Sequence, residues 1–130
     1  RDDTVDAGEI GAGHSVTALY EIKRHPDVEG PIATVYLRWQ DPQSREVSEV
    51  NVTLDSAQLT PAFTETSPSF QLAVIVAEYA EVLRESYWAQ ENTLAGVQEE
   101  AERIGRLFEG NADVEEFVEL TGRAARLPKE

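Results

Sequence analysis

Apolar residues dominate residues 67–85, SPSFQLAVIVAEYAEVLRE, and leave only a narrow polar stripe if this stretch is helical. At about 100° per residue, the polar side chains share one sector of the helix: Gln71, Glu78, Glu81 and Glu85. Ser67 can cap the N-terminus, and Pro68 suits the first helical position because its missing N–H has no intrahelical partner there. The pattern predicts a central core helix, buried over most of its circumference.

Three stretches before this helix alternate apolar and polar residues with the period of a β-strand: residues 14–23, 32–40 and 45–54. The second and third are separated by DPQS, residues 41–44, with aspartate first and proline second, as β-turns favour. Residues 32–54 are therefore predicted to form an antiparallel hairpin. One face of this hairpin is expected to hold alternate apolar residues: Ala33, Val35, Leu37, Trp39, Val50, Val52 and Leu54.

Two further helices follow the core helix in the predicted order of elements. Thr93 is placed to cap a helix over residues 94–108, which Gly110 helps to end, and a third helix covers residues 112–126. Strands come first and helices after, which indicates an α+β fold. We expect an antiparallel sheet of three or more strands within residues 1–66, packed with three helices within residues 67–130, in a single domain over residues 1–130.

Composition excludes several classes of function. The chain has 25 acidic and 11 basic residues and a net charge of −14, which opposes binding to nucleic acid or to an anionic membrane surface. The three glutamates in the core helix also exclude a membrane span there. The chain has no cysteine, so thiol catalysis, zinc–thiolate sites and disulfides are excluded. It opens with RDDTVDAGE and has no methionine, so we expect it to be a piece of a longer protein.

Few residues offer chemistry beyond packing. Tyr87 and Trp88 lie in a polar break between the first two helices, and with Leu19, on the polar face of its strand, they are the candidate contacts for a partner. No catalytic, cofactor-binding or metal-binding residue is predicted, and no cofactor is expected. The leading expectation is a non-enzymatic domain.

Two alternatives remain open at the level of sequence. One is a hydrolase-like enzyme that uses His14 with a nearby acid, Glu9 or Asp6. The other is a calcium-binding module whose loop oxygens come from two acidic clusters: Asp2, Asp3 and Asp6, or Asp27 and Glu29.

Four stretches carry a resemblance to a known family: GEIGAGHSVTALYEI (8–22), LRWQDP (37–42), SPSFQLAVIVAEYAEVLRES (67–86) and VEEFVELTGRAARL (114–127). Together they resemble the C-terminal region of bacterial von Willebrand factor type A domain proteins. The resemblance implies a type A domain upstream in the parent protein and a location in the cell envelope or outside the cell. It carries over no metal-binding residue, because DSAQL, residues 55–59, lacks the second serine of the Asp-x-Ser-x-Ser adhesion motif.

The resemblance, together with the lack of predicted catalytic or ligand-binding residues, favours an accessory domain that supports protein–protein contacts. Its expected partners are proteins, including the adjacent type A domain, with no nucleic acid and no membrane insertion by this piece. We also expect that the strand over residues 14–23 leaves an open edge through which two copies of the chain could form a homodimer.

Overall fold

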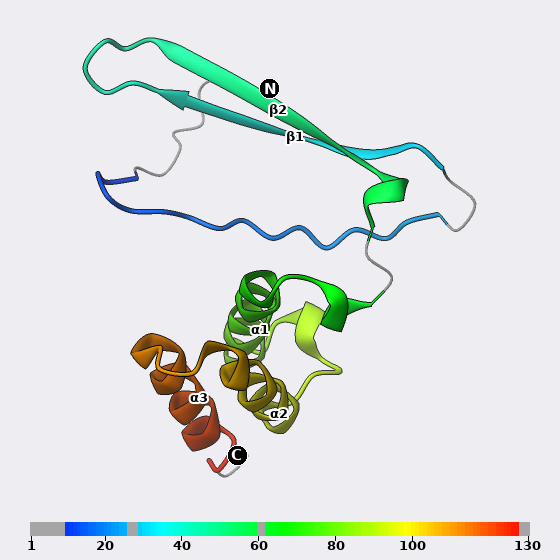
Figure 1. Ribbon diagram of the computed structural model, residues 1–130, viewed down its shortest axis with the longest axis vertical. Helices are drawn as coiled ribbons and strands as arrows, with labels where there is room; N and C mark the ends of the chain where they lie inside the picture. The colour runs from blue at the N-terminus through cyan, green and yellow to red at the C-terminus, as the bar shows by residue number, and fades with distance from the viewer. Residues whose placement is uncertain (1–9, 26–28, 60–61, 128–130) are drawn as a thin grey trace. The chain divides into compact units, whose positions relative to one another are not determined.

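The structure is a computed structural model that describes residues 10–25, 29–59 and 62–127. It contains a two-stranded antiparallel sheet and three α-helices, so the α+β class predicted from the sequence is confirmed (Figure 1). The chain divides into two compact units, Glu21–Ser67 and Arg1–Tyr20 with Pro68–Glu130. The single domain over residues 1–130 stays a prediction.

The first unit contains the predicted hairpin, formed by β1 (Pro31–Gln40) and β2 (Val47–Asp55). Its register sets Val35 opposite Val52 and Leu37 opposite Val50, so the predicted apolar face is confirmed. The opposite face carries polar pairs, including a hydrogen bond between the hydroxyls of Thr34 and Thr53 at 3.0 Å. Two strands alone have no second layer to cover an apolar face, and Leu37 is accordingly 60% exposed.

The turn of the hairpin is organised by Asp41. Its Oδ1 accepts hydrogen bonds from the backbone N–H of Gln43 at 2.8 Å and of Ser44 at 2.7 Å. These bonds hold the pKa of the Asp41 carboxyl below its usual value. Arg45 adopts a left-handed backbone with φ of 62° and belongs to the turn, so β2 begins two residues later than the predicted strand.

The predicted strand over residues 14–23 is not found. Residues 14–23 are described by the structure but join no sheet, because the sheet in the described residues contains β1 and β2 only. Alternation along this stretch defines the side chains that would share a face. However, a strand also needs a neighbouring edge that offers backbone hydrogen bonds, and alternation does not say where that edge lies.

The second unit contains the three helices, with α2 (Leu94–Gly105) packed against both α1 (Pro68–Leu83) and α3 (Ala112–Ala124). Two side-chain caps fix where the later helices begin. Thr93 Oγ1 accepts the Gly96 N–H at 3.1 Å, as predicted, and Asn111 Oδ1 accepts the Val114 N–H at 3.2 Å. Helices α1 and α3 meet where the rings of Tyr79 and Phe117 pack edge to face, with centroids 5.8 Å apart.

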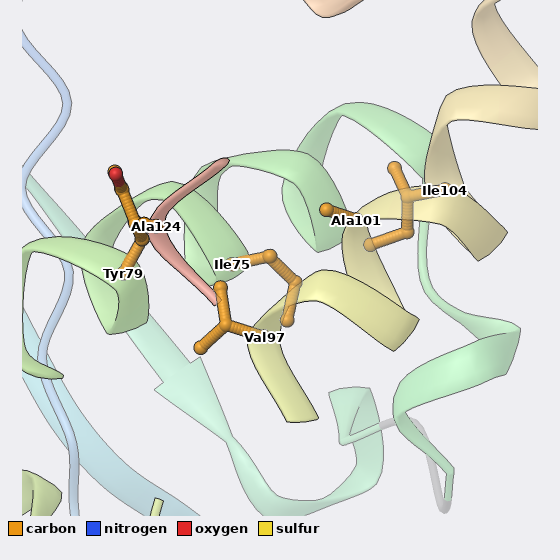
Figure 2. Close-up of a cluster of buried hydrophobic side chains, with 6 residues drawn as sticks. All are labelled: Ile75, Tyr79, Val97, Ala101, Ile104 and Ala124. Carbon is orange, nitrogen blue, oxygen red and sulfur yellow. The ribbon is translucent and has the colours of Figure 1, made fainter. Parts of the chain in front are cut away.

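The hydrophobic core lies between these helices and is centred on α2 (Figure 2). Figure 2 shows six of its buried side chains, contributed by all three helices: Ile75, Tyr79, Val97, Ala101, Ile104 and Ala124. Close approach of α2 and α3 depends on small residues, since a Cβ added at Gly105 would lie 2.9 Å from Val118 Cγ2. The most buried stripe of the unit therefore belongs to α2 rather than to α1.

The prediction that α1 is buried over most of its circumference was wrong. Its buried residues are Gln71, Ile75 and Tyr79, which form a single stripe, whereas Val76 and Leu83 are exposed. Gln71, expected on the polar side, is 2% exposed because its Oε1 accepts a hydrogen bond from Arg103 Nη2 on α2 at 2.9 Å. An apolar helix is buried only where partner helices contact it, and the hydropathy of α1 could not indicate which of its sides they occupy.

A polar cluster accompanies this contact between α1 and α2. Arg103 also binds Glu100 Oε2 through Nη2 at 2.7 Å and through Nε at 3.0 Å. Partial burial of Glu78, and then the negative charge of Glu100, raise the pKa of the Glu78 carboxyl. Arg103 thus links the carboxylate of Glu100 to the buried amide of Gln71 across the helix pair.

Candidate functional site

The break between α1 and α2 begins with an unusual helix end. The N–H of Ser86 donates to the carbonyl of Glu81 at 3.0 Å, and the N–H of Glu85 donates to the carbonyl of Val82 at 3.1 Å. These two bonds form a Schellman motif, which places Glu85 in a left-handed conformation with φ of 53°. Glycine is the usual residue at such a position, and an L-residue there costs on the order of 1 kcal/mol.

Ser86 then starts a short 3₁₀ turn, Tyr87–Ala89, and fixes its backbone. Its Oγ accepts the Trp88 N–H at 3.4 Å, and its carbonyl accepts the Ala89 N–H at 3.0 Å. Ala89 is buried and anchors the far end of the turn, where its carbonyl accepts the Asn92 N–H at 3.0 Å. The two aromatic residues therefore project from a backbone that is held on both sides.

Tyr87 and Trp88 are exposed and contact each other. Tyr87 is 72% exposed and Trp88 is 77% exposed. Their rings are nearly perpendicular at 86°, with centroids 5.2 Å apart. Edge-to-face contact stabilises an aromatic pair, so the two rings restrain each other without being buried. We call residues 85–89, which carry this pair, the aromatic turn.

The charge beside the aromatic turn is negative. Arg84 pairs with Glu81 at 3.3 Å, which leaves little net charge on that pair. Glu85 forms no ion pair within the described part of the chain. The backbone carbonyls at the C-terminal end of α1 add a partial negative charge at the same place. This surface therefore favours a positively charged group.

The other residues singled out from the sequence lie elsewhere. Leu19 lies in the extended stretch before the hairpin and is 38% exposed, and no hydrogen bond or ring contact joins it to the aromatic pair among the residues that the structure describes. The structure thus brings Tyr87 and Trp88 together but not Leu19. The homodimer through residues 14–23 stays a prediction.

His14 has a local role in the structure. Its N–H donates to the Gly11 carbonyl at 3.1 Å, and its imidazole lies so close that a Cβ on Gly11 would meet Nδ1 at 3.2 Å. The acids proposed to assist it, Glu9 and Asp6, lie outside the described residues, as do Asp2, Asp3 and Asp27 of the predicted calcium clusters. Glu29 is described and exposed.

Within the ranges that the structure covers, no three His, Asp or Glu side chains are grouped closely enough to hold a metal ion. No helix in those ranges is both long and apolar enough to cross a membrane. Two shallow grooves flank α3, and their charged lining consists of carboxylates with one arginine each: Asp113, Glu116, Glu119 and Arg123 in one, and Glu102, Glu109, Glu115 and Arg106 in the other.

Sequence reasoning found the aromatic pair but missed the residues that position it. Glu85 was predicted to be the last residue on the polar stripe of the core helix, and Ser86 to begin the polar break that follows it. Nothing in the sequence marks the left-handed backbone of Glu85, whereas Ser86 is recognisable as a serine two residues before Trp88. Serine in that position closes a turn through its hydroxyl.

Comparison with known proteins places the chain in a family. The model of the family described as "Uncharacterized protein YfbK, C-terminal" matches residues 1–31 and 23–127. Neither the curated proteins nor the solved structures gave a match. Since the family model spans nearly all of the sequence, the chain belongs to the family of the YfbK C-terminal domain.

Proposed function

We propose that this chain is a non-enzymatic interaction domain that docks a protein partner through the aromatic turn. The observation that carries the proposal is the pair of Tyr87 and Trp88, each more than two-thirds exposed on a backbone fixed by hydrogen bonds. Tyrosine and tryptophan supply much of the binding energy at protein interfaces, since each buries about 150–250 Å². A partner that covers the pair gains this area without having to order the turn.

The proposed partner is a von Willebrand factor type A domain in the same bacterial cell-envelope or exported protein. Support comes from the resemblance of residues 8–22, 67–86 and 114–127 to the region that follows such domains, and from a family that is itself described as a C-terminal part of a protein. In this account, the type A domain supplies the activity, and the YfbK C-terminal domain holds it in place or links it to other proteins.

Fluorescence of Trp88 tests this proposal. The chain has two tryptophans, so a Trp39→Phe variant reports on Trp88 alone. On addition of the parent protein's type A domain, we expect its emission to shift to shorter wavelength and its quenching by acrylamide to fall, because the indole becomes buried. Trp88→Ala is expected to weaken binding by at least about 30-fold, as for a hot-spot residue worth about 2 kcal/mol.

The matched control is Trp88→Phe, in which the remaining Trp39 reports from the hairpin. Its emission should stay unchanged when the type A domain is added. Unchanged emission from Trp88 would show that the aromatic turn is not the docking site. Equal affinity for the type A domain of the chains with and without Trp88→Ala would show the same.

A further inference from the structure

We infer that the group taken up by the aromatic turn is a cation, an arginine side chain on a basic segment of the partner. This inference rests on the proposed function and adds the chemistry of the partner. Three observations meet at one place: open aromatic faces, an ion-pair-free carboxylate and a strained backbone that keeps this carboxylate there.

The aromatic faces provide the first attraction. The face of an aromatic ring is electron-rich, and a guanidinium or ammonium group within about 6 Å of the ring centre is attracted to it. The two rings stand at 86° to each other, so the edge of one covers only part of the other, and both remain largely exposed. Arginine fits such a surface better than lysine because its guanidinium is planar and stacks on aromatic rings.

Charge provides the second attraction and selects against other partners. Glu85 lies two residues before Tyr87, and its carboxylate is not neutralised by an ion pair in the described ranges. The chain as a whole carries a net charge of −14, which draws basic segments and repels acidic ones. A purely apolar partner would gain nothing from this carboxylate, whereas an arginine would engage it together with the rings.

The backbone of Glu85 gives the independent sign that this carboxylate matters. A glycine at φ of 53° would close the same Schellman motif with less strain. Strained residues persist where the surrounding structure enforces them, and they concentrate at binding and catalytic sites. The glutamate therefore contributes something that glycine cannot: a negative charge two residues before the aromatic pair, which adds to the attraction of the rings for a cation.

The experiment uses two blocked hexapeptides that differ in charge alone. One contains two arginines, and the other contains citrulline, the neutral analogue of the same shape, at both positions. In the Trp39→Phe chain, we expect the arginine peptide to change Trp88 emission and to bind about tenfold more tightly than the citrulline peptide. The difference should shrink at high salt, where exposed charges are screened.

Two substitutions of Glu85 separate recognition from folding. Glu85→Gln should weaken binding of the arginine peptide about threefold, and Glu85→Gly should do the same while raising the melting temperature. The matched control is Glu116→Gln on α3, an exposed position with the same change in net charge, which should leave the affinity unchanged.

Equal binding of the two peptides, or equal weakening by Glu85→Gln and Glu116→Gln, would overturn the inference. Failure of the arginine peptide to bind at all would also overturn it. If the type A domain still buries Trp88 in that case, the proposed docking function stands and only its cationic chemistry is wrong. If neither the peptide nor the type A domain affects Trp88 emission, the proposed docking function and the inference of a cationic partner are both wrong.

Discussion

Replacing Ile104 by alanine is expected to lower the free energy of unfolding by about 2–5 kcal/mol, as for large-to-small changes in well-packed cores. Ile104 is 0% exposed and packs with Ile75, Val97 and Ala101 from two helices (Figure 2). Removing three side-chain carbons leaves a cavity that the rigid helix contacts cannot close. Urea unfolding of the full chain, followed by circular dichroism at the helix band, measures the loss.

Leu107→Ala is the matched control for this prediction. Leu107 lies three residues further along the chain and is 53% exposed, so its truncation should cost less than about 0.5 kcal/mol. Equal losses from the two substitutions would mean that the core is not centred on α2.

Arg103→Met is expected to lower the free energy of unfolding by about 1–3 kcal/mol at pH 7.5, since Gln71 Oε1 loses a buried hydrogen bond. Methionine keeps most of the apolar length of the side chain, so the change isolates the charged head. The loss of unfolding free energy should grow with pH because of Glu78 and Glu100.

Glu78 holds its proton more tightly in the folded chain than in the unfolded one, because its pKa is raised from 4.5. Its contribution to stability is therefore complete below about pH 4.5 and is lost as pH rises through the raised pKa. Without Arg103, the charge of Glu100 is no longer offset, which raises the pKa of Glu78 further and increases this loss. Unfolding at pH 5.5 and 7.5 measures the difference.

Arg106→Met serves as the control, because Arg106 is exposed at the end of α2 and its substitution removes the same charge as Arg103→Met. Its effect should stay within about 0.5 kcal/mol at both pH values. An Arg103→Met effect that is equally small would show that the polar cluster between α1 and α2 does not stabilise the fold, and an effect that decreases with pH would show that Arg103 does not influence Glu78 through Glu100.

Local rules predicted much of the secondary structure. Alternation and the DPQS turn located the hairpin and its apolar face, because side-chain period and turn chemistry act over a few residues. Helix starts at Pro68 and Leu94 followed from capping for the same reason. The predicted C-terminal boundaries were less accurate, since α2 ends at Gly105 and passes into a 3₁₀ turn through Phe108.

Features that depend on distant partners could not be predicted. The burial of Gln71 requires Arg103, which lies 32 residues away in the sequence. The exposure of Val76 follows from the side on which α2 and α3 pack, and residues 14–23 lack a strand edge to join in the described sheet. In each case, composition indicates what a side chain favours but not which neighbour is available.

The candidate site was predictable in its aromatic residues but not in its geometry. Two large rings in a polar break are visible in the sequence, and a partner contact was expected from them. The left-handed backbone of Glu85 was not expected, because glutamate rarely adopts it and nothing in the local pattern requires it. In that conformation, Glu85 ends the helical path of α1 and begins the aromatic turn.

Hydrogen exchange of the backbone amides, measured with and without the type A domain, shows whether this domain docks on the aromatic turn. The amides of Ser86, Ala89 and Asn92 are held by the hydrogen bonds of the aromatic turn and report on its opening. We predict that added type A domain slows exchange in residues 84–92 and leaves exchange in α2 and α3 unchanged. Slower exchange in other segments, with residues 84–92 unaffected, would show that the type A domain docks elsewhere on the chain.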